Sequence, residues 1–138
     1  LEENWSRDII KTMQGLHAEI KGTRGAAAGL AVLDIAAGEL RYTGVGNTVI
    51  RRFGSGNGSL FSSEGIIGSH IRTPREQKLQ LAESDVLLLY TDGVEENFKL
   101  QEYPQLVYQR ARSITRTVIH RFGKMYDDAT CVAVRYER

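Results

Sequence analysis

The sequence has little of several features that would assign it to a functional class at once. Its 138 residues contain one cysteine, Cys131, which excludes an internal disulfide and fits a reducing compartment, so we expect a cytoplasmic protein. No apolar run approaches the roughly 18 residues that a membrane span needs, and no secretory signal opens the chain. The net charge is only +1, so neither nucleic acid nor an acidic membrane is predicted as a partner.

What the chain does contain is the composition of an ordinary globular domain. Hydrophobic residues make up 41% of the sequence and charged residues 25%, and this balance suffices for one domain with a buried core. A helix is predicted over 1–20, because apolar residues recur there every three or four positions, at Leu1, Trp5, Ile9, Met13, Leu16 and Ile20. A second helical pattern covers about 104–122.

The remaining patterned segments favour β-strands. Strands are predicted at 29–34, 40–45, 48–53, 78–82, 86–90 and 129–134. Because successive strands are joined by short turns, we expect an α+β fold of mainly antiparallel sheets with helices packed on their faces.

Acidic residues lie where two of the predicted strands end or begin. Asp92 and Gly93 follow the apolar strand 86–90, and Asp127 and Asp128 come directly before the last strand. A carboxylate at the rim of a rigid strand is well placed for a metal site, and a glycine leaves room for water or a ligand beside it. The alternative is that Asp-Gly is turn chemistry and Asp127-Asp128 a solvated strand start. The two motifs together favour an all-oxygen site for Mg²⁺ or Mn²⁺.

Four stretches, in this order along the chain, resemble metal-dependent protein phosphatases (PPM) of the stage II sporulation E branch. Segment 24–33 is similar to the family's glycine-rich entry into a core strand, and 42–50 to its glycine-centred hairpin. Segment 86–96 resembles the family's strand-and-loop signature, and 127–130 its closing Asp-Asp/Asn-x-Thr motif. A match of four ordered motifs is far more specific than any one of them.

The resemblance implies an α-β-β-α sandwich that holds two Mn²⁺ or Mg²⁺ ions. Asp92 and Asp127 match the family's metal-ligand aspartates, while Gly93 and Asp128 match positions that support the metal site. The implied reaction is hydrolysis of phosphoserine or phosphothreonine on a bacterial signalling protein by a metal-activated water. The compact form resembles the small relatives that reset stress-signalling scaffolds of the stressosome kind. Substrate choice is expected in loops such as 54–77.

The sequence also departs from the family pattern. The family's first metal aspartates lie in strands ahead of the first helix, and no such motif occurs in 1–21. Because both later motifs are intact, we expect 1–138 to be a single phosphatase domain that lacks its N-terminal strands. Exposed sheet edges would then favour pairing with a second copy of the chain. The alternative function is a non-catalytic interaction module or an inactive fragment of the phosphatase fold.

Two further features are not assigned to catalysis. Cys131 lies inside a predicted strand and is expected to be a small buried residue. A basic stretch occupies the second helix, at Arg110, Arg112, Arg116 and Arg121. Such a stretch usually forms a solvated face, and the alternative is a docking surface for an acidic partner.

Overall fold

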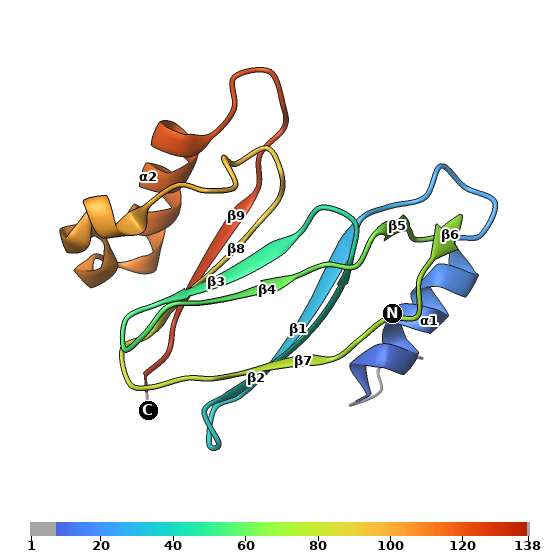
Figure 1. The fold of residues 1–138 in the computed structure, drawn as a ribbon, viewed down its shortest axis with the longest axis horizontal. Helices are drawn as coiled ribbons and strands as arrows, with labels where there is room; N and C mark the ends of the chain where they lie inside the picture. The colour runs from blue at the N-terminus through green and yellow to red at the C-terminus, as the bar shows by residue number, and fades with distance from the viewer. Residues whose placement is uncertain (1–7, 138) are drawn as a thin grey trace. The chain divides into compact units, whose positions relative to one another are not determined.

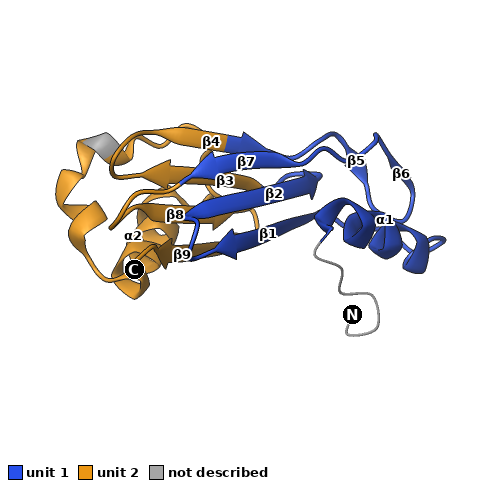
Figure 2. Cartoon of the chain, turned by 90° about the horizontal axis from the view of Figure 1, so that it is seen from below, with its two compact units in different colours: residues 1–48, 60–80 blue, residues 49–59, 81–138 orange. Residues whose placement is uncertain are grey.

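The computed structural model describes residues 8–137, which divide into two compact units (Figure 2). The first unit contains residues up to 48 together with 60–80, and the second contains 49–59 together with residues from 81 onward. Each unit is built around its own antiparallel sheet and carries one α-helix (Figure 1). The units are therefore described one at a time.

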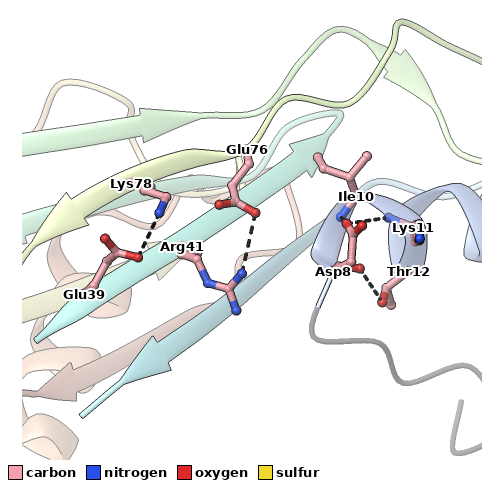
Figure 3. A network of polar contacts seen from close by, with 8 residues as sticks. All are labelled: Asp8, Ile10, Lys11, Thr12, Glu39, Arg41, Glu76 and Lys78. Carbon is pink, nitrogen blue, oxygen red and sulfur yellow. Dashed lines mark hydrogen bonds and ion pairs between the residues drawn. The ribbon is translucent and has the colours of Figure 1, made fainter. Parts of the chain in front are cut away.

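The first helix, α1 (Ile9–Glu19), begins at a side-chain cap. The Asp8 carboxylate accepts hydrogen bonds from the backbone N–H groups of Ile10 and Lys11 at 3.0 and 3.1 Å (Figure 3). This cap satisfies donors that the first turn leaves without partners in the helix. The helix buries Ile9 and Met13, as its apolar periodicity predicts. The earlier positions of that pattern, Leu1 and Trp5, lie outside the described residues.

The sheet of the first unit has the strand order β1-β2-β7 and is antiparallel throughout. Its strands are β1 (Ala28–Asp34), β2 (Glu39–Val45) and β7 (Gln77–Gln80), and a short hairpin of β5 (Gly65–Ile66) and β6 (His70–Ile71) accompanies them. The helix α1 packs on β1 and β2, where Met13 joins a core cluster with Val45 and Ile67. Strand β1 alternates between partly buried and exposed residues from Ala28 to Val32, so one of its two faces is in solvent.

Charges alternate across the β2–β7 pair and support its register. Lys78 Nζ lies 3.1 Å from Glu39 Oε1, and Arg41 lies 3.8 Å from Glu76 (Figure 3). Arg41 and Lys78 are directly opposite each other in the register, so the two glutamates separate their like charges. Each partly exposed pair of this kind contributes at most about 1 kcal/mol.

A tyrosine packed over two glycines organises the end of β2. Gly44 lies opposite Gly29 in the β1–β2 pair, and the hydroxyl of Tyr42 bonds Thr48 Oγ1 at 2.8 Å and Ser62 Oγ at 2.7 Å. A Cβ atom at Gly44 would stand 2.2 Å from both the Tyr42 and the Ser62 oxygen atoms. Position 44 therefore has to be glycine for these hydroxyl groups to meet.

The predicted glycine-centred hairpin over 42–50 is not formed. Strand β2 pairs with β1 and β7, whereas the next strand, β3 (Val49–Phe53), pairs with β8 in the other sheet. Both sides of β2 are occupied, so β3 has no place beside it. The intervening Gly46 has a φ of +101°, a conformation that favours glycine.

The sheet of the second unit has the strand order β4-β3-β8-β9. Its inner strand β8 (Val86–Tyr90) is predicted correctly to the residue, and it lies between β3 and β9 (Cys131–Arg135). The first residues of β4 (Gly58–Phe61) also belong to this unit. Four of the five residues of β8 are fully buried, which explains why the strand is apolar throughout rather than alternating.

The helical segment predicted over about 104–122 is interrupted. The structure has short 3-10 turns η1 (Leu100–Glu102) and η2 (Pro104–Tyr108) ahead of α2 (Ala111–Phe122). The Arg135 guanidinium of β9 donates hydrogen bonds to the carbonyl oxygens of Val107 and Gln109, which a continuous helix would use itself. Gln109 is extended as a result, and the helix restarts after it.

The α2 helix packs on β9 and contributes Ile114, Val118 and Phe122 to the core of the second unit. With α1 on its own sheet in the first unit, the structure confirms an α+β fold with mainly antiparallel sheets and flanking helices. Within the part of the chain that the structure describes, no helix is long and apolar enough to cross a membrane.

Candidate metal centre

The two predicted acidic motifs are brought together by the β8–β9 pair. These strands run antiparallel with Tyr90 opposite Cys131, so the chain leaves β8 at the end of the sheet where it enters β9 (Figure 1). Thr91 and Thr130 connect the two loops. The Thr91 N–H donates to the Thr130 carbonyl oxygen at 3.1 Å, and the Thr130 N–H donates to Thr91 Oγ1 at 3.1 Å. Asp92 and the Asp127-Asp128 pair therefore flank a shared, hydrogen-bonded junction.

Gly93 is the point of closest approach between the two loops. A Cβ atom at this position would stand 2.0 Å from the Asp128 carbonyl oxygen and 2.8 Å from the Ala129 Cα atom. These are backbone atoms, which cannot rotate out of the way. We expected Gly93 to leave room for water or a ligand, but the main chain of Asp128 fills the space where its side chain would be.

The loop after β8 is also held from the side of α2. The Lys124 N–H donates to the Gly93 carbonyl oxygen at 2.7 Å, and the Glu95 N–H donates to the Phe122 carbonyl oxygen at 2.8 Å. Val94, between these two anchored residues, is fully buried in the core. The main chain below the Asp92 carboxylate is thus fixed by contacts on both sides.

The three aspartate side chains at this junction, those of Asp92, Asp127 and Asp128, are exposed. Carboxylate oxygen atoms are the donors that hard cations such as Mg²⁺ and Mn²⁺ prefer, so the chemistry of these residues fits such an ion. Their number does not complete a site. Within residues 8–137, His, Cys, Asp and Glu form no group of three or more that could hold a metal ion.

Cys131 faces Tyr90 across the junction, and its thiol is not activated. Burial raises the pKa of the Cys131 thiol from 9.0 to about 11. Burial also raises the pKa of Tyr90, although the nearby Arg51 guanidinium opposes this effect. A thiol with a raised pKa is a poor nucleophile at neutral pH, so the chemistry of this site does not pass through Cys131.

Arg51 is a structural residue of this region that no sequence motif marks. Its guanidinium donates to the Phe98 carbonyl oxygen at 2.7 Å and lies 4.8 and 4.7 Å from the ring centres of Phe53 and Phe98. It therefore connects β3 to the far end of the loop that begins at Asp92. The sequence shows only that two arginines, Arg51 and Arg52, stand in an otherwise apolar strand, and this sign is ambiguous by itself.

The loop region in which we expected substrate choice contains an open hollow of about 610 Å³ in the first unit. It is lined by Ser63, Glu64, Ile71, Arg72, Thr73 and Arg75. The Arg72 and Glu64 side chains form an ion pair of 3.3 Å there, with both groups largely in solvent. The hollow offers hydroxyl and guanidinium groups to a ligand, and no sequence motif indicated it.

A family model described as "Stage II sporulation protein E (SpoIIE)" matches residues 6–137. No curated protein sequence matches the chain.

Several solved structures share the fold. One, described as "The bacterial stressosome: a modular system that has been adapted to control secondary messenger signaling", has a TM-score of 0.82 and 25% identity, and the match covers 97% of this chain and 70% of that one. RsbX in complex with magnesium has a TM-score of 0.75 at 17% identity, covering 97% and 67% of the two chains. The phosphatase domain of the cell fate determinant SpoIIE from Bacillus subtilis (Mn presoaked) has a TM-score of 0.62 at 22% identity, covering 99% and 68%.

Proposed function

The chain belongs to the stage II sporulation E (SpoIIE) family of PP2C-type phosphatase domains, and on this premise we propose that it acts in a protein serine/threonine phosphatase. Its substrates are phosphoserine and phosphothreonine on a bacterial signalling protein. The observation that carries the proposal is the junction of the two acidic loops, with Thr91 bonded to Thr130 and Gly93 packed on Asp128. An Asp-Gly turn and a solvated strand start would not need to be joined in this way.

The cofactor proposed for this site is a pair of Mn²⁺ or Mg²⁺ ions, held in part by Asp92 and Asp127. Such ions, when bound, lower the pKa of a coordinated water and offset the charge of the phosphoryl group. The residues of this chain position the ligands. Gly93 and Asp128 pack the two loops against each other, so the Asp92 and Asp127 side chains extend from a main chain that is held in place. The proposed site needs further ligands, because His, Cys, Asp and Glu form no group of three or more among residues 8–137.

The wider setting is proposed from the family. The partner is a phosphorylated signalling protein of a stress response, and the setting is the cytoplasm, which suits the single unpaired Cys131. Pairing of a second copy is proposed at the sheet edges. Among the described residues, the outer strands are β1 and β7 in one sheet and β4 and β9 in the other.

The test is release of phosphate from a phosphoserine peptide with and without Mn²⁺, for the chain and for its Asp92→Asn variant. We expect the variant to lose turnover by about a hundredfold or more, because the substitution removes a charged metal ligand while keeping its shape. Mn²⁺ binding, followed by electron paramagnetic resonance, should weaken in parallel. The matched control is Glu96→Gln, which removes one exposed carboxylate from the same loop and should keep both properties. Unchanged turnover in Asp92→Asn would exclude Asp92 as a ligand.

The second candidate function is a non-catalytic interaction module or an inactive fragment of the phosphatase fold. The observation that favours it is the lack, within residues 8–137, of any metal-binding group of three. If the chain releases no phosphate at any Mn²⁺ or Mg²⁺ concentration and binds neither ion, this candidate replaces the enzyme.

A further inference from the structure

Segment 103–126 has a charge that the rest of the chain does not share. It contains no aspartate or glutamate and five residues that are always or mostly cationic, which are Arg110, Arg112, Arg116, Arg121 and Lys124. The whole chain has a net charge of only +1, so this positive charge is concentrated in and around α2. Clustered cations create a positive electrostatic potential around this segment, even though the net charge of the whole chain is close to zero.

The α2 helix presents part of this charge on one side. Its inward side is fixed by the buried residues Ile114, Val118 and Phe122. With 3.6 residues per turn, Arg112, Arg116 and His120 then share the outward side and Ile119 borders it. All four are exposed, Ile119 by 36% of its surface. We call these four residues the basic face. Arg121 is not part of it, because its guanidinium stacks over the Tyr103 ring at 4.9 Å.

The two arginines of the basic face make no ion pair that would stabilise the fold. None of the ion pairs found among residues 8–137 involves Arg112, Arg116 or His120. The first turn of α2 has no acidic residue, and its N-cap residue, Arg110, makes no capping hydrogen bond with its side chain. Cations at a helix N-terminus oppose the helix dipole and destabilise it slightly. Arg112, in the first turn, therefore has a position that its own helix does not favour, and with Arg116 it is available to bind a partner.

We propose that the basic face of α2 binds an acidic segment of the phosphoprotein substrate, an inference that rests on the proposed phosphatase function. Arg112 and Arg116 are suited to bind carboxylates, because a guanidinium group binds a carboxylate through two parallel hydrogen bonds. Ile119, one turn after Arg116, offers an apolar contact, and binding surfaces on proteins are typically enriched in arginine around such contacts. The partner is an acidic peptide with an apolar residue among its carboxylates.

A nucleic acid fits this unit less well than an acidic peptide. A phosphate backbone gains nothing from Ile119, and the exposed carboxylates of Asp92, Asp127 and Asp128 in the same unit would repel it along its length. A peptide can place its acidic segment on the basic face alone.

The basic face is connected to the candidate metal centre by a short, anchored stretch of chain. The helix ends at Phe122, and Lys124 bonds Gly93 before the chain reaches Asp127. From Arg116 or Arg112 to the end of α2 at Phe122 the axial distance is about 9–15 Å at 1.5 Å per residue. An extended peptide covers this distance in about three to five residues. The acidic segment therefore lies about that far from the phosphorylated residue.

The first test measures binding without catalysis. A fluorescein-labelled, unphosphorylated peptide with four glutamates around a leucine is titrated with the protein, and fluorescence anisotropy is followed at low and high salt. We expect the Arg112→Gln/Arg116→Gln double variant to bind about tenfold more weakly, and added salt to weaken binding by the wild type. The matched control, Arg121→Gln, removes charge from another side of the same helix and should change affinity less than twofold. Circular dichroism melts show whether each variant is folded.

Three outcomes of that experiment would overturn the proposal. These are equal binding of a peptide with glutamine in place of glutamate, equal binding by the double variant, and tighter binding of a DNA oligonucleotide of the same charge. The last outcome would assign the face to nucleic acid.

The second test connects binding to turnover. For a phosphoserine peptide with glutamates three to five residues away, the double variant should raise KM about tenfold and leave kcat unchanged. Hydrolysis of p-nitrophenyl phosphate, which has no acidic segment, should not change. If KM is unaffected, the face does not bind the substrate. If no phosphate is released but the anisotropy result holds, the phosphatase proposal fails while the acid-binding surface stands.

Discussion

Single residues decide whether the two acidic loops can lie against each other. Gly93 has no side chain, and the Asp128 carbonyl oxygen occupies a position 2.0 Å from where its Cβ atom would be. The φ angle of Gly93 is not among the positive values that favour glycine, so packing rather than backbone conformation requires glycine here. Conservative changes at this position therefore act on the distance between the loops.

We predict that Gly93→Ala destabilises the protein by about 2–4 kcal/mol, because the new methyl group meets main-chain atoms that cannot yield. The measurement is urea unfolding followed by circular dichroism. Gly15→Ala is the matched control. Gly15 lies inside α1 with nothing within 4 Å of its Cβ position, so the same change should stabilise the protein by about 0.5–1 kcal/mol. Equal stability of the two variants would contradict the close packing of Gly93.

At the scale of elements, buried polar contacts decide where strands and helices begin. Asp85, which is fully buried, stands one residue before β8 and accepts three hydrogen bonds. They come from the Ser55 N–H at 2.7 Å, the Ser55 hydroxyl at 3.0 Å and the Ala82 N–H at 2.9 Å. This carboxylate joins the turn after β3 to the start of β8. Its sequence context indicates only a turn.

We predict that Asp85→Ala destabilises the protein by about 2–4 kcal/mol, because it leaves backbone donors buried without an acceptor. Asp34→Ala is the control. The Asp34 carboxylate also accepts a hydrogen bond from a backbone N–H, that of Ala37 at 2.9 Å, but this bond is exposed to solvent. In the variant, water can accept the hydrogen bond from Ala37 instead. Its effect on the urea midpoint should be much smaller. A small effect of Asp85→Ala would show that the buried donors find other partners.

For the whole molecule, two weak acids at the β8–β9 junction, the buried Tyr90 and the partly buried Cys131, make stability depend on alkaline pH. Burial raises the pKa of Cys131 from 9.0 to about 11 and also raises the pKa of Tyr90. A group whose pKa is higher in the folded state than in the unfolded state binds its proton more tightly when folded. Its contribution to stability is complete below the unfolded pKa and is lost as the pH rises through the folded pKa.

We therefore predict that the free energy of unfolding is insensitive to Cys131 ionisation below about pH 9 and falls between about pH 9 and 11. The measurement is urea unfolding at pH 7, 8, 9, 10 and 11. Cys131→Ala, which has no thiol to ionise, should show a shallower fall than the wild type over the same range. Parallel curves for the two proteins would show that the thiol does not contribute. Alkylation of Cys131 should likewise be slow at pH 7 and accelerate as the pH approaches 11.

The amino-acid sequence by itself determined the elements whose formation depends on neighbours in the chain. The apolar run of β8, the apolar periodicity of α1 and the Asp-Gly and Asp-Asp motifs are all local patterns. The resemblance of four such motifs to one phosphatase family is confirmed by the family match over residues 6–137. The roles of Asp92, Asp127 and Asp128 at a metal remain predictions.

Only the tertiary structure decided what depends on partners distant in the chain. Strand β3 joins β8 rather than β2, because both sides of β2 are already paired. The second helix breaks at Gln109, because Arg135 takes the carbonyl groups that would continue it. Gly93 is needed for the approach of Asp128, a residue 35 positions later. Sequence periodicity indicates which side of a helix or strand is apolar. Which strand or helix it packs against depends on the available space and on hydrogen bonds that form only in the folded protein.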